Sequence, residues 1–403
     1  MLEVVSLHDV KEILEREFKP SNKTETVSLL DATNRILVED IVSNEYIPSF
    51  DRSTMDGYAL KAKDTFGCSE SIPAILNMVG KIQMGEKPKS INDYECLYIP
   101  TGGALPLGAD AVSMIEYSED FNDGTIGINK PVSPGMNIIR KGDDIKPHDV
   151  IIAKGKKLSA NDIGSLAAMG ITKVTVSKKM KVGIISTGDE LVDISIQPKE
   201  GEIRDVNSYL LSSLIQEENL IPINYGIIKD DEQLISETID KAINECDVVL
   251  MSGGSSAGEK DNAAKILSNK GKLLFHGISI KPGKPTMLAN IKNKPVFGIA
   301  GHPLAVLFIT SYIIKPFLRY LMDGTYVIKK RYAKLLEAID SNHGRSEFVM
   351  LKLIEDDGEL YAKPIITKSG LITTSLKCDG VALIDRNSEG KNKGDRIEVL
   401  DVI

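Results

Sequence analysis

The stretch "DVVLMSGGSSAGEKD" at residues 247–261 decides the fold. Its short apolar run, 247–251, is typical of a buried strand, and the small residues that follow would present backbone N–H groups to a ligand. The loop matches neither the phosphate loop nor the dinucleotide-binding turn, and it ends in Glu259, Lys260 and Asp261. We interpret it as an anion-binding loop, with Asp261 capping the next helix; a plain turn is the alternative.

The same alternation of apolar strands and amphipathic helices extends from about residue 181 to 323. We expect strands at 181–186, 222–228, 247–251, 273–279, 286–291 and 295–299. We expect helices at 206–219, 231–245, 261–270 and 303–322. This pattern predicts an α/β domain at 181–325, with a mostly parallel sheet covered by helices. In such sheets ligands bind beyond the carboxyl ends of the strands, and the loop at 252–261 and the other polar motifs of this domain fall at strand ends.

The remaining sequence does not show this alternation of strands and helices. Residues 46–146 combine short β-like pieces with turn signals such as "MDG" and "SPG", which predicts an inserted β domain. Segments 1–45 and 147–180 carry helical and strand patterns and would together form a segmented domain around it. Residues 326–403 predict a small C-terminal β-barrel or sandwich. The fold class is therefore multidomain, α/β plus β.

Composition limits the classes of function. A chain of 403 residues is expected to form two to four domains. Its net charge of -8 argues against broad nucleic-acid binding, which needs a basic face. The four cysteines form no Cys-x-x-Cys pair, and the N-terminus lacks a signal peptide, so we expect a cytoplasmic protein. Charged residues and a proline interrupt the apolar stretch 304–322, which favours a buried helix over a membrane span.

Three groups of polar residues in this domain are candidates for binding a ligand. The first, in "GIISTGDELV" at 183–192, is Ser186, Thr187, Gly188, Asp189 and Glu190. Its carboxylates could bind Mg²⁺ or a polar ring, or they could be first-turn acids of a helix. The second group, Asp205 and Asn207, stands before a helix and has the same capping alternative. The third is Lys281 and Lys284, in a loop that prolines stiffen, which suits an oxyanion unless the loop is merely a solvated basic one.

His302 opens the last long helix, where a structural role is the main alternative to ligand binding. In the β domain, Asp51 and Asp56, with Asp143 and Asp144, are candidate acids that ordinary turns also explain. No Ser-His-Asp or Cys-His nucleophile is recognisable. Acids for a divalent cation, amides for phosphate and lysines for an anion together indicate phosphoryl, nucleotidyl or oxyanion chemistry.

Eight motifs in a fixed order give a specific resemblance. They are "FDRSTMDGYAL", "IPTGGALPLGADAVSMIEY", "NIIRKGDDI", "ISTGDEL", "IRDVNSYLL", "SGGSSAGEKD", "IKPGKP" and "GRSEF". With them the chain resembles the molybdopterin molybdenumtransferases, the MoeA and gephyrin E-domain family, over essentially all of its length. The resemblance implies an enzyme that inserts molybdate, or tungstate, into adenylylated molybdopterin and releases AMP in a Mg²⁺-dependent step. It also implies a homodimer whose cleft combines the α/β domain of one subunit with the inserted domain of the other, and other cofactor-biosynthesis proteins as possible partners.

The resemblance assigns roles motif by motif. Catalytic roles fall to Asp56, Thr101, Asp144, Glu190, Asp205 and Asp261, and Asp205 and Asp261 would also bind Mg²⁺. Substrate-binding roles fall to Ser186, Thr187, Gly188, Asp189, Ser252, Gly253, Gly254 and Ser255. Lys281, Lys284 and Arg345 would contact molybdate, with His302 beside them. The pterin dithiolene is itself a soft metal ligand, so no protein cysteine is needed.

One segment departs from the family pattern. Where the family usually has Pro-Gly-Asn-Pro-Val-Ser, this chain has Ala300, Gly301, His302, Pro303, Leu304 and Ala305. The loss of the serine hydroxyl removes a donor expected near the oxyanion, and we hypothesise altered oxyanion handling, such as a preference for tungstate. Two alternatives are a non-catalytic molybdopterin-binding scaffold and a molybdopterin adenylyltransferase. The inserted and C-terminal domains argue against the second.

Overall fold

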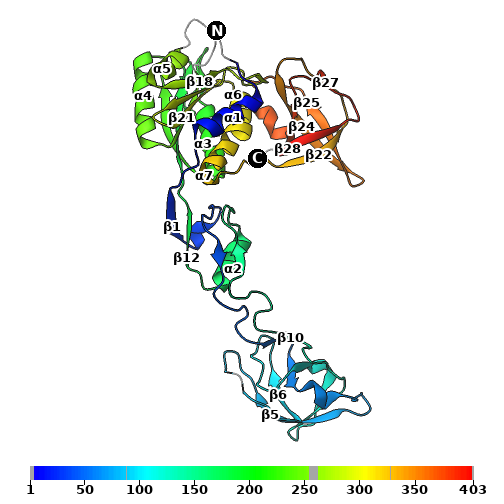
Figure 1. Cartoon of the computed structure of the whole chain (residues 1–403). Helices are drawn as coiled ribbons and strands as arrows, with labels where there is room; N and C mark the ends of the chain where they lie inside the picture. Colours follow the sequence, from blue (N-terminus) through cyan, green and yellow to red (C-terminus); the bar gives the residue numbers. More distant parts are fainter. Residues whose placement is uncertain (1–3, 88, 254–261, 327, 402–403) are drawn as a thin grey trace. The chain divides into compact units, whose positions relative to one another are not determined.

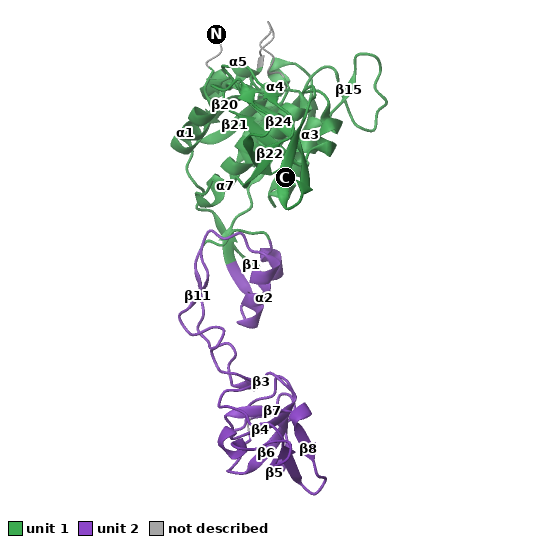
Figure 2. Cartoon of the chain, turned by 90° about the vertical axis from the view of Figure 1, so that its right-hand side faces the viewer, with its two compact units in different colours: residues 1–27, 34–38, 175–403 green, residues 28–33, 39–174 purple. Residues whose placement is uncertain are grey.

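The computed structural model describes residues 4–87, 89–253, 262–326 and 328–401. Contacts divide the chain into two compact units, shown in Figure 2. Unit 1 comprises Met1–Val27, Asn34–Val38 and Thr175–Ile403, and unit 2 comprises Ser28–Thr33 and Glu39–Val174. Two of the unit boundaries, after residues 27 and 174, fall within two short strands, β1 (Thr24–Ser28) and β12 (Lys173–Ser177), which pair with each other.

Unit 1 is built on a six-stranded sheet in the order β16-β13-β17-β21-β20-β18. Four neighbouring strands are parallel: β16 (Ile221–Ile228), β13 (Lys181–Thr187), β17 (Val248–Ser252) and β21 (Lys294–Ile299). Of the other two strands, β20 (Met287–Ile291) pairs antiparallel with β21, and β18 (Lys272–His276) pairs antiparallel with β20. The strand expected at 273–279 ends early, at His276, and the chain then leaves the sheet. The mostly parallel α/β domain expected from the sequence is confirmed.

Helices cover both faces of this sheet (Figure 1). One face carries α1 (Leu7–Glu17), α3 (Asn207–Glu217), α6 (Pro303–Ile309) and α7 (Lys315–Asp323), and the other carries α4 (Glu232–Glu245) and α5 (Asn262–Lys270). Successive strand side chains point to opposite faces. Ile184 and Leu250 therefore join the α3 and α7 side, whereas Ile185 and Val249 join the α4 and α5 side. Burial on both faces explains why these strands are apolar throughout.

The first helix belongs to the core of unit 1. The sequence pattern predicts residues 1–45 as part of a segmented domain, but Val10 and Leu14 of α1, with Phe18 directly after it, are buried in the same core as the sheet. The Phe18 and Phe317 rings meet edge to face at 5.7 Å between centroids. The helix starts at a capping box, in which Ser6 and Asp9 satisfy each other's backbone N–H groups.

The long apolar helix expected at 303–322 is a core helix. It comprises α6, a π-helical turn at Thr310–Ile314 and α7. Among the described residues it is the single helix, Pro303–Asp323, whose length and composition would allow a membrane span. However, 83% of its most apolar window is buried inside the protein. That burial accounts for its apolar character.

The C-terminal part of unit 1 is a closed sheet. Its strands are β24 (Ser346–Asp356), β25 (Glu359–Ile365), β22 (Lys330–Leu335), β28 (Arg396–Asp401) and β26 (Gly380–Ile384), and β26 pairs back onto β24. This closure settles the choice between barrel and sandwich in favour of a barrel-like sheet. A short strand of the α/β segment, β19 (Ile280–Lys281), adds to it by pairing with β24.

Unit 2 contains a second six-stranded sheet, in the order β7-β4-β6-β5-β9-β8. The strands are β4 (Gly57–Leu60), β5 (Ala74–Lys81), β6 (Glu95–Ile99), β7 (Ala111–Met114), β8 (Ser118–Asp120) and β9 (Thr125–Ile128). Elsewhere in unit 2, β2 (Ile41–Val42) pairs with β11 (Val150–Ile152), near α2 (Ala160–Ala168) in sequence. This pairing joins the two segments that flank the inserted β domain.

Candidate functional site

The carboxyl ends of three parallel strands lie side by side in unit 1. Ser186 of β13 is the register partner of Ser252 of β17, and Ser252 is the partner of Ile299 of β21. The residues that follow these positions therefore meet at one edge of the sheet. This edge carries the polar groups that the sequence pattern placed after the strands, so the structure brings them together.

Asp205 is buried beneath this edge, with 4% of its surface exposed. Its Oδ1 accepts hydrogen bonds from Ser186 Oγ at 3.0 Å and from the Ser208 N–H at 3.1 Å. Its Oδ2 accepts a third bond from Ser208 Oγ at 2.5 Å. The carboxylate thus ties the end of β13 to the first turn of α3, which supports the capping interpretation. Its role as a Mg²⁺ ligand stays a prediction.

Asn207 bridges the ends of two strands. Its Nδ2 donates to Ser252 Oγ at 2.7 Å and to the Gly301 carbonyl at 2.8 Å. Its Oδ1 and the nearby Thr187 Oγ1 are buried without a hydrogen-bond partner among the described residues. Buried polar atoms are costly to leave unpaired, so a bound ligand could satisfy them. Sequence reasoning named Asn207 only as a possible cap and missed this bridging position.

Glycines let the loops at this edge approach one another. Gly253 has φ +97°, and a Cβ there would lie 2.1 Å from the Thr187 carbonyl oxygen. A Cβ at Gly301 would meet only the Gly253 Cα, at 3.8 Å. Residue 253 therefore has to be glycine for steric reasons. The next predicted site residues, Gly254, Ser255 and Asp261, lie outside the described residues.

Two exposed carboxylates, Asp189 and Glu190, follow Gly188. The interpretation of them as first-turn acids of a helix is wrong, because the chain continues as strand β14 (Leu191–Val192). Asp189 Oδ1 accepts the Asp230 N–H at 3.3 Å. The Glu190 carboxylate folds over Gly188, so that a Cβ at Gly188 would lie 2.8 Å from Glu190 Oε2. In the described part of the chain, no three His, Cys, Asp or Glu side chains cluster as a metal site would.

A cavity of about 790 Å³ lies between the 280–285 loop, the start of α6 and the barrel. Its wall contains four residues that the sequence assigned to the anion: Lys281, Lys284, His302 and Arg345. They come from three separate stretches of chain, and the pairing of β19 with β24 brings the lysine loop to the "GRSEF" segment. Lys368 also lines the wall and was not anticipated from the sequence.

The cationic side chains of this cavity differ in their hydrogen-bond partners. Lys281 Nζ donates to Glu347 Oε1 at 2.7 Å, and Glu347 Oε2 accepts a second bond from Ser341 Oγ at 3.0 Å. Among the residues that the structure describes, the Lys284 ammonium and the Arg345 guanidinium have no hydrogen-bond or ion-pair partner. Two uncompensated cations on one wall favour an anionic ligand.

The departing segment contributes unevenly to the cavity. Ala300 and His302 line it, whereas Ala305 is 1% exposed and is not part of the wall. The Leu304 N–H donates to the Ser369 carbonyl at 3.2 Å, and the N–H groups of Ala305 and Val306 donate to His302. The exposed imidazole of His302 is therefore the polar group that this segment presents to a ligand.

In unit 2, Asp56 and Thr101 form a pair. Asp56 Oδ1 accepts the Thr101 N–H at 2.7 Å and the Thr101 hydroxyl at 3.0 Å. These two hydrogen bonds, the backbone one first, lower the pKa of Asp56 below its usual value. Asp144 is exposed in the same unit.

Two other acids of unit 2 have structural roles. Asp51 accepts the Lys141 N–H and Asp143 accepts the Arg140 N–H, both at 2.7 Å. These bonds fix loops, which supports the turn interpretation of those two acids.

Comparisons with known proteins agree with this architecture. A protein of Methanocaldococcus jannaschii named for molybdopterin biosynthesis is 35% identical over 97% of this chain and 95% of its own. The molybdopterin molybdenumtransferase of Staphylococcus aureus strain COL is 30% identical over 97% and 94%. The chain belongs to the MoeA family. A crystal structure of the MoeA protein from Pyrococcus horikoshii superposes with a TM-score of 0.86, at 34% identity, covering 99% of this chain and 100% of that one.

The MoeA family descriptions match successive parts of the chain. "MoeA N-terminal region (domain I and II)" matches residues 5–170, and "Probable molybdopterin binding domain" matches 183–320. "MoeA C-terminal region (domain IV)" matches residues 332–402. The second match spans β13 to α7, and the third coincides with the barrel-like sheet. The family and the fold class expected from the sequence motifs are thus confirmed.

Proposed function

We propose that this chain is a molybdopterin molybdenumtransferase, which inserts molybdate into adenylylated molybdopterin and releases AMP. Membership of the MoeA family supports the class, a transferase of molybdenum cofactor biosynthesis. The observation that carries the proposal is the cavity that Lys281, Lys284, His302 and Arg345 share. Its lysine and arginine side chains would attract a tetrahedral dianion, and its volume falls within the usual range for small-molecule sites.

The strand edge would hold the organic substrate. Ala300, on the cavity wall, is followed by Gly301, whose carbonyl accepts the Asn207 bond that also reaches Ser252. Ala300 and Gly301, which are adjacent in the chain, thus link the anion cavity to the strand-end groups. Thr187 Oγ1 and Asn207 Oδ1, which have no partner among the described residues, would hydrogen-bond the polar ring of the pterin or its phosphate, and Lys284 and Arg345 would orient the metalate beside it.

Magnesium would act with the substrate's phosphates. Mg²⁺ keeps several waters and is usually bound by one or two carboxylates plus phosphate oxygens, and it would neutralise charge that develops on the adenylate. At this edge the exposed carboxylates of Asp189 and Glu190 are available, whereas Asp205 is already engaged in three hydrogen bonds. We therefore propose Glu190, together with Asp261, as the carboxylates that would face the ion. Asp205 would instead hold Ser186 and α3 in place.

Unit 2 would supply the remaining acids. Its Asp56 is kept ionised by the two bonds from Thr101, and such a carboxylate can accept a hydrogen bond or a proton during cleavage of the adenylate. We propose that these residues act in a homodimer, opposite the strand edge of a second copy. The sequence resemblance, rather than any contact described above, motivates this part of the proposal.

The test is an insertion assay with purified protein, adenylylated molybdopterin, Mg²⁺ and molybdate, followed by AMP release. AMP release that depends on molybdate supports the proposal, and ligand retained unchanged would indicate a binding module instead. Lys284→Gln should raise the KM for molybdate about tenfold, because a charge-assisted contact is worth roughly 1.5 kcal/mol. The control Lys393→Gln removes an exposed lysine outside the cavity and should leave the KM unchanged.

A further inference from the structure

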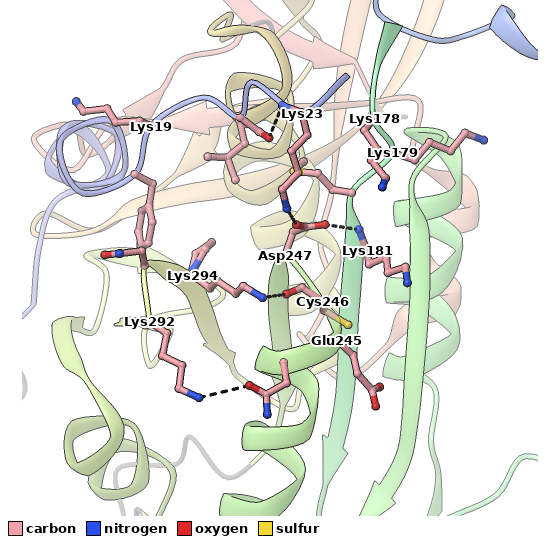
Figure 3. A pocket seen from close by; sticks show the side chains of 17 residues that line it. Lys19, Lys23, Lys178, Lys179, Lys181, Glu245, Cys246, Asp247, Lys292 and Lys294 are labelled. Carbon is pink, nitrogen blue, oxygen red and sulfur yellow. Dashed lines mark hydrogen bonds and ion pairs between the residues drawn. The ribbon is translucent and has the colours of Figure 1, made fainter. Parts of the chain in front are cut away.

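A second pocket lies at the opposite edge of the parallel sheet (Figure 3). Its volume is about 480 Å³, and its wall includes Lys181 at the start of β13, Asp247 just before β17 and Lys294 at the start of β21. On β13, Lys181 and Ser186 are five residues apart. At a rise of about 3.3 Å per residue, this pocket is roughly 17 Å from the strand ends that carry the proposed active site. The two sites are therefore separate.

Lysines dominate the wall of this pocket. Seven of them line it: Lys19, Lys23, Lys178, Lys179, Lys181, Lys292 and Lys294. Among the lining residues that the structure describes, the only carboxylates are those of Glu245 and Asp247. Such an excess of positive charge is unexpected in a chain whose net charge is -8. Like charges gathered at one site repel each other, and a bound anion would relieve that repulsion.

Some of these lysines already have structural partners. Lys294 Nζ caps the end of α4 by donating to the Ile243 and Cys246 carbonyls at 2.5 and 2.7 Å. Lys23 pairs with Asp247 at 2.9 Å, and Asp247 also accepts the Lys181 backbone N–H at 2.9 Å. These contacts fix the floor of the pocket, and Figure 3 draws those between its lining residues.

Two lysine side chains of this wall differ from the other five in their contacts. Among the residues that the structure describes, the side chains of Lys178 and Lys181 have no hydrogen-bond or ion-pair partner. Their backbones, by contrast, are held, because the Lys178 N–H donates to the Lys23 carbonyl and Lys181 lies in β13. In the view of Figure 3, Lys19 and Lys179 point away from Asp247, and their Nζ atoms donate to the Glu15 carbonyl at 2.9 Å and to Asn219 Oδ1 at 2.6 Å. The pocket thus has a fixed floor, with the Lys178 and Lys181 ammonium groups left to meet a ligand.

We propose that this pocket binds a compact polyanion with two or more linked phosphate groups. Lysine ammonium groups are point charges on flexible stems, so they suit clustered phosphate oxygens rather than one planar carboxylate. Among the described residues that line the wall, Phe18 is the only aromatic one, and it is 4% exposed, so these residues offer no open platform for a nucleobase. The ligand class is therefore an oligophosphate, recognised by its charge.

The test titrates tripolyphosphate into the full-length protein by isothermal titration calorimetry, at fixed ionic strength and without Mg²⁺. We expect one saturable site that is insensitive to a nucleoside group, so that ATP binds no more tightly than tripolyphosphate. The double variant Lys178→Gln/Lys181→Gln should weaken binding about tenfold, since two surface charge contacts are together worth about 1.4 kcal/mol. Neither side chain makes a hydrogen bond or ion pair within the described part of the chain, so this variant should fold normally and retain the insertion activity.

Two matched controls locate the site. Lys281→Gln/Lys284→Gln removes the same charge from the anion cavity and should leave tripolyphosphate binding at the lysine pocket unchanged. Lys391→Gln/Lys393→Gln removes two exposed barrel lysines and should also have no effect. The proposal is overturned if tripolyphosphate does not bind, or if binding is lost in the cavity variant instead. It is also overturned if the lysine-pocket and barrel variants weaken binding equally, because that would reflect net charge alone.

Discussion

Replacing Glu347 tests whether the anion cavity attracts molybdate by charge. In the free protein its carboxylate holds Lys281 Nζ at 2.7 Å, so a metalate that binds this lysine has to share it with an anion. Replacing the carboxylate by the isosteric amide, Glu347→Gln, keeps the shape and keeps an acceptor for Lys281, while it removes the negative charge. We expect this variant to bind molybdate more tightly than the unmodified protein.

The size of the effect follows from the contact distances. A dianion on the far side of the ammonium would lie about 6 Å from the Glu347 carboxylate, two hydrogen-bond lengths away. At that distance the repulsion is about 1.4 kcal/mol in water, and salt at physiological ionic strength reduces it by roughly half. The remaining ~0.7 kcal/mol corresponds to about a threefold lower KM for molybdate. Lys281 is 60% exposed, which justifies the dielectric constant of water.

The assay measures the KM for molybdate in AMP release and, independently, the Kd of molybdate by calorimetry. Glu337→Gln is the matched control, because that carboxylate also lines the cavity but pairs with Lys363 at 2.9 Å rather than with Lys281. It should change the KM less than Glu347→Gln does. A KM that rises in Glu347→Gln would refute the reasoning, since Glu347 would then serve to position Lys281 for the ligand.

Three further predictions concern other parts of the site. Thr101→Val removes the hydroxyl bond and should raise the pKa of Asp56 toward its usual value in an NMR titration, while Thr101→Ser should not. Because folding lowers the pKa of Asp56, the stability that this carboxylate contributes is present at neutral pH and is lost as the pH falls through the folded pKa. Gly253→Ala should destabilise unit 1 by more than about 1 kcal/mol in thermal unfolding, since an L-residue is strained at φ +97° and its Cβ would strike Thr187, whereas Gly301→Ala should be tolerated. Ala305→Ser should leave the competition between molybdate and tungstate unchanged, because residue 305 is buried off the cavity wall; a shift toward molybdate would instead support the hypothesis that the lost hydroxyl sets the preference for tungstate.

Much of the α/β fold was predictable because its patterns are local. Three of the parallel strands, β13, β17 and β21, are apolar on both faces, and small residues such as Gly188, Gly253 and Gly301 follow them, so their ends could be located to within a few residues. The early end of β18 at His276 could not be predicted. Residues 277–281 still look apolar, but Ile280 and Lys281 pair with Ser346 and Glu347 of the barrel. A strand pattern reports burial, and it does not report which sheet provides it.

Individual site residues show the same limit. Capping was a reasonable interpretation of Asp205, and the structure adds that its cap also holds Ser186 of a neighbouring strand. The first-turn interpretation of Asp189 and Glu190 failed because short acidic segments look alike before a helix and before a strand. The seven-lysine pocket had no sequence signal, since its members are scattered between residues 19 and 294.

By itself, the sequence determined the class of the fold, the family and the chemical character of each loop, because these depend on residue type and on spacing along the chain. Only the tertiary structure decided which charges meet. It placed Glu347 on Lys281, left Lys284 and Arg345 uncompensated among the described residues, and gathered lysines at the far edge of the sheet. The physical reason is that electrostatic energy depends on distances in space, which the closing of the barrel and the pairing of β19 with β24 establish.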